Sequence, residues 1–166
     1  MEATDSLYNT TGLRRQDRAL PQNLADRLLH EGEFGTLCLQ DTAGGGYGVP
    51  LNYVWDGGDF LYMHCAPQGH KITCLTSAPR ACFVIAGTTH ILPEKFSTAY
   101  ESVILHGEVR LVEDTAEKRA ALSMLIQKLT PRETERGAQY IERAIDATAV
   151  LRFRISHYCG KAHQSP

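Results

Sequence analysis

The sequence lacks the features that mark several large classes of protein. No apolar run approaches the roughly 18 residues that a membrane-spanning helix needs, and the acidic first residues do not have the order of a signal peptide. Lys and Arg total 17 against 19 Asp and Glu, so the net charge of -2 offers no basic surplus for nucleic acid or an anionic membrane. We therefore expect a cytoplasmic protein that binds neither nucleic acid nor membrane.

Familiar catalytic and metal-binding motifs are missing too. The five cysteines form no C-x-x-C pair, and in a reducing compartment they are predicted to be free thiols (Cys38, Cys65, Cys74, Cys82 and Cys159). There is no G-x-S-x-G motif, and the glycine-rich segment 44–48 precedes a strand instead of linking a strand to a helix, unlike a dinucleotide-binding loop. Histidines and cysteines form no compact four-ligand set, so we predict no metal site.

What is present is a pattern of short strands with helices between them. A chain of 166 residues suits one domain, and we assign residues 1–18 to a polar N-terminal arm and 19–166 to that domain. Alternating apolar residues predict six strands, at about 34–40, 47–55, 59–64, 80–86, 99–112 and 148–155. Helices are expected at about 20–32, 69–78, 114–130 and 133–145, and residues 88–97 are expected to form a loop. This predicts a mainly β (α+β) fold, an antiparallel barrel with helices packed outside.

Two local signals refine this prediction. Gly107 lies inside a long strand and indicates a β-bulge. Asp114 and Glu117 have the spacing of a capping box, in which each side chain bonds the backbone of the other at a helix start.

The segment 64–71 could bind an anion. A strand ends near His64, a turn of small residues follows, and a helix begins at Gly69, His70 and Lys71. Free backbone N–H groups at a helix start favour an anion, and Lys71 adds a positive charge. The alternatives are an ordinary solvated turn and, for His64, a histidine with a purely structural role, either in the core or on the surface.

Two other segments could contact a flat ligand. Gly48 permits close approach to the backbone of segment 47–53, and Pro50 donates no ladder hydrogen bond, which indicates an edge or distorted strand. Ser102 shares one strand face with Ile104 and His106, so its hydroxyl could bond a ring atom. A plain edge strand and a surface hydroxyl remain the alternatives.

Together, these segments resemble the FMN-binding split-barrel superfamily typified by pyridoxamine 5′-phosphate oxidase, and most closely its nitroimidazole-resistance branch. The resemblance covers about residues 34–112 and, more weakly, 152–161. It is carried by the motifs Val49-Pro50-Leu51-Asn52-Tyr53, Leu61-Tyr62-Met63-His64-Cys65-Ala66 with Gly69-x-Lys71, and His90-Ile91-Leu92-Pro93-Glu94-Lys95-Phe96 running into Tyr100-Glu101-Ser102-Val103 and Gly107.

The resemblance implies a six-stranded antiparallel split β-barrel that binds FMN as a homodimer, with each flavin site completed by two subunits. By position, it implies that Val49, Pro50, Leu51 and Asn52 line the flavin ring, that His64, Cys65 and Ser102 lie at the flavin, and that His70 and Lys71 hold the phosphate. In the family a permanent cation usually stands where this chain has His70. Segment 158–161 offers no counterpart to the oxidases' contacts to pyridoxal phosphate, which disfavours vitamin B6 oxidation.

The leading functional hypothesis is an FMN-dependent oxidoreductase that reduces small (nitro)aromatic acceptors. His64 is the expected proton donor, because its ordinary pKa lies near neutral pH. A non-catalytic flavin-binding protein is the second hypothesis. A haem-binding member of the superfamily, with His163 as axial ligand, is the third.

Overall fold

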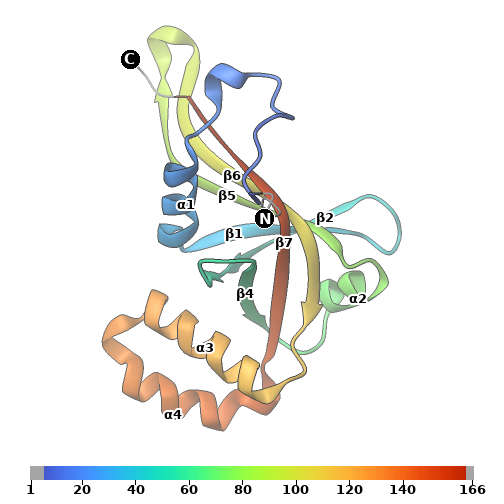
Figure 1. Ribbon diagram of the computed structural model, residues 1–166. Coiled ribbons are helices and arrows are strands. Elements are labelled where there is room, and N and C mark those ends of the chain that lie inside the picture. Colours follow the sequence, from blue (N-terminus) through green and yellow to red (C-terminus); the bar gives the residue numbers. More distant parts are fainter. Residues whose placement is uncertain (1–5, 164–166) are drawn as a thin grey trace, which may run out of the picture.

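The computed structural model describes residues 6–163, which form one antiparallel seven-stranded sheet with helices packed around it (Figure 1). The strand order is β2-β1-β5-β6-β7-β4-β3. The strands are β1 (Phe34–Gln40), β2 (Gly46–Asn52), β3 (Val54–Trp55), β4 (Phe60–Cys65), β5 (Arg80–Leu92), β6 (Ser97–Leu111) and β7 (Ala149–His163). The predicted mainly β antiparallel fold is therefore confirmed, with seven strands in place of six because the predicted strand 47–55 is interrupted at Tyr53.

Tyr53 also explains why the sheet is rolled into a barrel. It is the single residue between β2 and β3, yet these two strands occupy opposite ends of the strand order. The sheet must curl for its two edges to meet at one residue. The Tyr53 side chain is fully buried, and its hydroxyl donates to the carbonyl of Leu29 at 2.9 Å, which attaches the junction to helix α1 (Gln22–Glu31).

Two apolar cores follow from the alternation of the strands. Inward-facing side chains fill the barrel, among them Leu37, Phe83, Leu105 and Phe153. Helix α1 covers one opening of the barrel with Ala25, Leu28 and Leu29, and α2 (His70–Ser77) contributes Cys74 and Leu75. A second core lies between strands β4 and β7 and the hairpin of helices α3 (Thr115–Leu129) and α4 (Thr134–Ala144), which pack side by side beyond the barrel (Figure 1).

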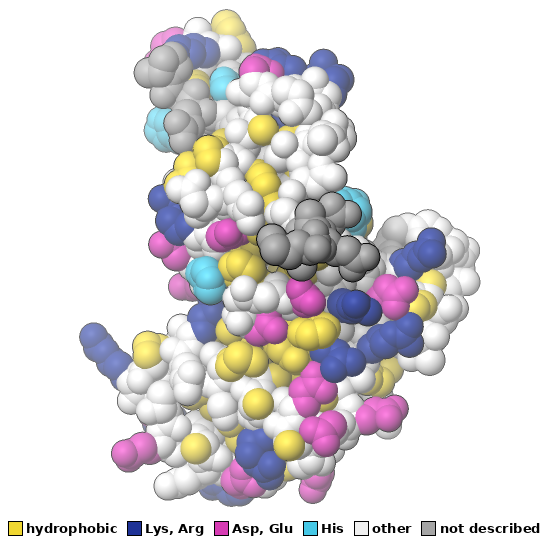
Figure 2. Space-filling model, in the orientation of Figure 1, with side chains coloured by type: hydrophobic (Ala, Val, Ile, Leu, Met, Phe, Trp, Pro, Cys, Tyr) yellow, Lys and Arg dark blue, Asp and Glu magenta, His cyan; other side chains and the backbone are white. Residues whose placement is uncertain are grey.

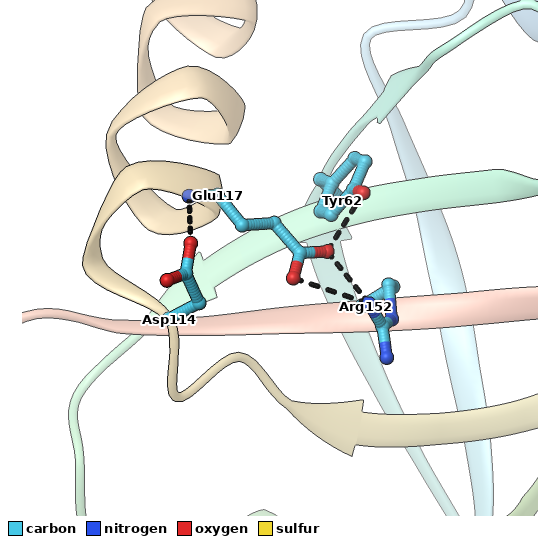
Figure 3. Close-up of polar contacts among 4 residues, drawn as sticks. All are labelled: Tyr62, Asp114, Glu117 and Arg152. Carbon is cyan, nitrogen blue, oxygen red and sulfur yellow. Dashed lines mark hydrogen bonds and ion pairs between the residues drawn. The ribbon is translucent and has the colours of Figure 1, made fainter.

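Helix α3 is attached to the sheet by a polar network at its first turn (Figure 3). The Asp114 carboxylate accepts from the backbone N–H of Glu117 at 2.7 Å, so the predicted N-cap is present. The Glu117 side chain does not return to the cap, as a capping box requires. It accepts instead from the Tyr62 hydroxyl at 2.9 Å and from the Arg152 guanidinium at 2.8 and 3.1 Å. Glu117, which the sequence assigned to the helix cap, therefore joins α3 to strands β4 and β7.

The loop predicted at 88–97 is wrong over most of its length. Strand β5 continues to Leu92, a short 3-10 turn spans Pro93–Lys95, and β6 starts at Ser97. Residues 89–92 pair with 97–100, so residues 88–100 form a hairpin arm that projects beyond the barrel (Figure 1). The polar residues and the proline suggested a loop, but an exposed two-stranded arm has no inward face and therefore no apolar alternation to display.

Strand β7 is also longer than predicted. Its second half, residues 156–163, pairs with β6 and buries only Tyr158 and Gly160, so apolar alternation is weak there. The register between β6 and β7 shifts between His106 and Gly107, so the predicted bulge at Gly107 is confirmed. A Cβ atom there would lie 1.9 Å from the carbonyl oxygen of Arg154, which explains why glycine is needed.

The described part of the N-terminal arm lies against β7. The backbone N–H of Asn9 donates to the carbonyl of Tyr158, and the N–H of Tyr158 donates to the carbonyl of Leu7, both at 2.9 Å. Residues 1–5, where the sequence argues against a signal peptide, and residues 164–166 lie outside the described range. No helix within residues 6–163 is both long enough and apolar enough to cross a membrane. On the face shown in Figure 2, acidic and basic side chains are intermingled.

Candidate functional site

Strand pairing around the barrel is interrupted between β2 and the end of β4, at a place that we call the split. Strand β2 pairs only with β1, so its other edge carries backbone groups without a strand partner in the described chain. Strand β3 pairs only with Leu61 and Tyr62, which leaves residues 63–65 of β4 unpaired on that side. Cα atoms of β2 and β4 nevertheless come within 8 Å of each other. Two strand edges without a strand partner therefore lie close to each other across the split.

On the β2 side, the split is bordered by backbone more than by side chains. Val49 and Leu51 pack against the barrel core, while Pro50 and Asn52 point outward and are exposed. The Asn52 amide donates to the carbonyl of Glu33 at 3.0 Å and is fixed in that direction. Pro50 lies opposite Thr36 on β1, at a position that cannot donate to the ladder. The edge can therefore accept a flat ligand against its peptide groups without a side chain in the way.

Helix α2 starts at the far end of the split and presents its first turn. Gly69 precedes it with φ 126°, a conformation that favours glycine, and no side chain caps the helix. Lys71 is half-buried. Burial raises the pKa of the Cys65 thiol, and the positive charge of Lys71 lowers it by a smaller amount. The N–H groups of the first turn and the Lys71 ammonium thus converge near the end of β4, as an anion site requires.

His70 is held by the loop between β1 and β2. Its Nε2 atom lies 2.7 Å from the Asp41 carboxylate, and its ring meets the Tyr47 ring edge-on, with 4.7 Å between centroids. The Cys74 sulfur lies 3.5 Å from the same Nε2 atom. The pKa of Asp41 is lowered, first by a hydrogen bond from the backbone N–H of Ala43 and then by His70. Asp41 was not predicted, because nothing in the sequence marks a loop residue 29 positions from its partner.

His64 and Cys65 are neighbours in sequence but face opposite sides of β4. Cys65 packs against the barrel core on the side of Lys71. His64 shares its face with Phe60 and Tyr62, as the alternation predicts, and lines an apolar pocket of about 270 Å³ below α3 and α4. The helix residues of this pocket include Leu122, Leu125, Leu129, Tyr140 and Ile141. The sequence did not predict this pocket, because apolar residues at helical spacing are expected both in a packed core and in the wall of a cavity.

The chain matches a known protein family over most of its length. The family described as pyridoxamine 5′-phosphate oxidase matches residues 21–162. The chain belongs to this family. No curated protein matches it at the level of sequence.

Solved structures agree on the family's split-barrel fold. A candidate 5-nitroimidazole antibiotic resistance protein from Bacteroides thetaiotaomicron superposes with a TM-score of 0.72 at 25% identity, covering 86% of this chain and 84% of that one. The flavocytochrome Anf3 from Azotobacter vinelandii superposes with a TM-score of 0.74 at 23% identity, covering 87% of this chain and 68% of that one. The FAD and heme binding protein from Mycobacterium smegmatis superposes with a TM-score of 0.75 at 20% identity, covering 89% of this chain and 73% of that one. The last two similarities concern the fold alone.

Within this family fold, Ser102 is remote from the split of its own chain. It lies on β6, which β5 and β1 separate from β2, and its partner on β7, Lys161, is 12 residues along that strand from Ala149, the partner of Cys65. Its hydroxyl is 3.5 Å from the carbonyl of Lys161 on β7. A single chain of this pyridoxamine 5′-phosphate oxidase family member therefore brings together β2, Cys65, His70 and Lys71, but leaves Ser102 elsewhere.

His163, the histidine considered for haem, lies at the end of β7 beside the hairpin arm. Its Nδ1 atom bonds the carbonyl of Thr98 at 2.8 Å and lies 3.3 Å from the Ser97 hydroxyl. One nitrogen of the ring is thus engaged within the arm of the chain itself.

Proposed function

We propose that this chain binds FMN in the split and reduces small nitroaromatic acceptors through it, as a homodimer. The observation that carries the proposal is the position of Lys71 and the first turn of α2 at one end of an opening bordered by free strand edges. A dianionic phosphate needs a fixed cation and N–H donors, and a flat ring system needs a smooth wall; the split offers both.

The residues present fit the cofactor. Lys71, His70 and the N–H groups of the first turn of α2 would hold the phosphate, and the β2 edge from Val49 to Asn52 would lie along the ring. Gly69 has open space around its Cα, with no atom within 4 Å of where a Cβ would stand, so the approach to the helix start is clear. The bound flavin supplies the electron transfer, while the protein binds, orients and shields it.

The apolar pocket beside His64 would take the acceptor. Its walls are mainly leucine and isoleucine with one tyrosine, which suits a small aromatic molecule more than a charged one. The imidazole of His64, an exposed residue at this pocket, would donate a proton to an acceptor oxygen, and Leu122, Leu125 and Ile141 would form the apolar wall beside it. The resemblance in fold to a candidate nitroimidazole resistance protein supports this class of acceptor.

The hairpin arm supports the dimer. Ile91 is 63% and Phe96 is 99% exposed, although both are large apolar side chains. A second copy of the chain would bury them, and the arm could bring Ser102 toward the flavin of the partner, which the distance within one chain prevents. Exposed apolar side chains on a projecting element are typical of surfaces that contact another protein.

Cofactor binding is tested by fluorescence titration of the flavin-free protein with FMN. Lys71→Met should weaken binding by about 10- to 100-fold, the effect of losing one charge-assisted contact worth about 1.5–3 kcal/mol. Lys118→Met, on α3 and away from the split, is the matched control and should bind like the unaltered protein. Equal affinity of the two variants would remove the phosphate site.

The reaction is tested anaerobically with the FMN-loaded protein, a chemical reductant and a nitroimidazole. Reduction of the nitro group that depends on His64, judged with His64→Asn, is the expected result. Full flavin loading without turnover would instead establish a non-catalytic flavin protein. A Soret band in place of a flavin spectrum would establish the haem-binding alternative, for which the flavocytochrome and haem-binding neighbours give a precedent in fold.

A further inference from the structure

A row of two cysteines and two histidines crosses four adjacent strands on the outer face of the sheet. Cys38 on β1 lies opposite Cys82 on β5, Cys82 lies opposite His106 on β6, and His106 lies opposite His157 on β7. Their chain neighbours Leu37, Phe83 and Leu105 are fully buried in the barrel, so the four side chains point away from it. The sequence gives no hint of this row, because its members are 119 positions apart from first to last.

The two cysteines are placed so that a disulfide could join them. Directly opposed residues of antiparallel strands have Cα atoms about 4.5 or 5.5 Å apart, and disulfides span Cα separations of about 4.4–6.8 Å. Both thiols are free and only half-buried. The Cys38 thiol donates to the carbonyl of Thr36 on its own strand at 3.7 Å, a weak bond that is easily given up.

His106 stands next to the reactive pair as a base. The Cys82 sulfur lies 3.2 Å from its Nδ1 atom. The other face of the ring stacks on His157, with 4.6 Å between centroids and 12° between planes. Burial, and then His157, lower the pKa of His106, which favours the neutral ring that can accept a proton. Burial, and then Cys38, raise the pKa of Cys82, so its thiol needs such a base to form the thiolate.

We propose that Cys38 and Cys82 are a redox-active dithiol that closes to a cross-strand disulfide, with His106 taking the proton of Cys82. The Cys82 thiolate attacks a low-molecular-weight disulfide, and one half leaves as a thiolate that receives the proton from His106. Cys38 then attacks the Cys82 sulfur, and its own proton goes to the second departing thiolate. Two protein thiols are oxidised to one disulfide, and the small disulfide is reduced to two thiols.

Such a disulfide would be a labile one. Opposed Cβ atoms in a sheet are about 4.5–5.5 Å apart, whereas a disulfide holds them near 3.8 Å, so closure must draw β1 and β5 together. Strain of this kind makes a disulfide easier to reduce, which is typical of regulatory bonds and not of structural ones. Closure would tie β5 to β1, whose Cys38 lies opposite Gly48 on the strand that borders the split.

The proposal is tested on the full chain by peptide mapping. The reduced protein is incubated with oxidised glutathione, free thiols are alkylated under denaturing conditions, and linked peptides are identified by mass spectrometry. The expected product joins Cys38 to Cys82 and leaves the remaining cysteines alkylated (Cys65, Cys74 and Cys159). A product that stops at a glutathione adduct on Cys82, a different pair, or five alkylated thiols would overturn the proposal. This measurement needs no variant and does not depend on whether the chain binds FMN.

Single substitutions test the separate roles of Cys38 and His106 in disulfide formation. In Cys38→Ser, Cys82 should stop at the glutathione adduct, whereas Cys159→Ser, a half-buried thiol on the same sheet, should close normally. His106→Gln should slow closure at pH 7 by about a hundredfold, the lower end of what a positioned general base contributes, because burial raises the pKa of the Cys82 thiol and leaves it protonated there without a base. His90→Gln, on the arm, is the control.

The pH dependence of the closure rate provides a second test of His106 as the base. Other charged or titratable groups that line the same face are Arg80 of β5, Glu108 of β6, His157 of β7 and Cys38 of β1. The difference between His106→Gln and the unaltered protein should vanish above the pKa of the thiol, where no base is needed. An equal rate for both proteins at pH 7 would remove His106 from the mechanism.

Discussion

Glu117 on α3 and Arg152 on β7 are joined through both carboxylate oxygens, at 2.8 and 3.1 Å, and one of those oxygens also accepts from Tyr62 (Figure 3). Burial, followed by Glu117, raises the pKa of Tyr62 to about 12, so its hydroxyl stays a donor at any working pH. This network fixes the helical hairpin that forms the walls of the apolar pocket.

Glu117→Ala should therefore destabilise the protein by about 1–3 kcal/mol, because it leaves two half-buried donors without their acceptor. Urea unfolding monitored by circular dichroism measures the change. The control is Glu142→Ala, which breaks the ion pair with Arg119 between two more exposed side chains and should cost much less, because water and salt screen exposed ion pairs. Similar losses in both variants would mean that the Glu117 network contributes no more than a surface ion pair.

Gly107→Ala should be strongly destabilising, by about 2–4 kcal/mol, since the new methyl group would collide with the backbone of Arg154 and disturb the bulge. Gly46→Ala is the matched substitution, because a Cβ there meets no atom within 4 Å. Thermal and urea unfolding of the two variants gives the comparison. A mild effect at Gly107 would indicate that β6 and β7 can change register at little cost.

Lys128 should impose a pH-dependent penalty on stability. Its ammonium has no hydrogen-bond partner in the described chain and lies 4.0 Å from the centroid of the Tyr53 ring. Burial lowers its pKa from 10.5 to about 8, against a smaller opposing effect of Glu33. Between these values the unfolded chain binds more protons than the folded one, so stability rises with pH through that window, and the penalty is complete below about pH 8.

Lys128→Met should accordingly stabilise the protein at pH 7, by about 1 kcal/mol once solvent screening of this partly exposed side chain is allowed for. The gain should fade as the pH approaches 10.5. Unfolding free energies of both proteins from pH 6 to 10 provide the test, and a gain that is independent of pH would point to packing instead of charge.

FMN should stabilise the folded protein by mass action. At a free concentration a hundred times the dissociation constant, the expected gain is about 2.7 kcal/mol. At the same FMN concentration Lys71→Met, with its 10- to 100-fold weaker binding, should keep only about 0.4–1.4 kcal/mol of this gain, whereas Lys118→Met should keep all of it. Melting temperatures with and without FMN measure the effect, and no shift in the unaltered protein would contradict the proposed cofactor.

Local sequence was sufficient to predict those features that depend on a single strand or helix. Alternation placed β1 and the face shared by Phe60, Tyr62 and His64, and the sequence around Gly69 and Lys71 predicted the start of α2. Gly107 marked its bulge before any partner strand was known. In each case the information is carried by the backbone preferences and side-chain period of a few consecutive residues.

The sequence by itself determined a mainly β chain, its strand faces and the start of helix α2. Only the tertiary structure decided which strands pair and in what register, and therefore that Asp41 meets His70, that Ser102 is far from the split, and that Cys38, Cys82, His106 and His157 form one row. The physical reason is that alternation fixes the side to which a residue points, whereas its neighbour across the sheet depends on contacts between segments far apart in the chain.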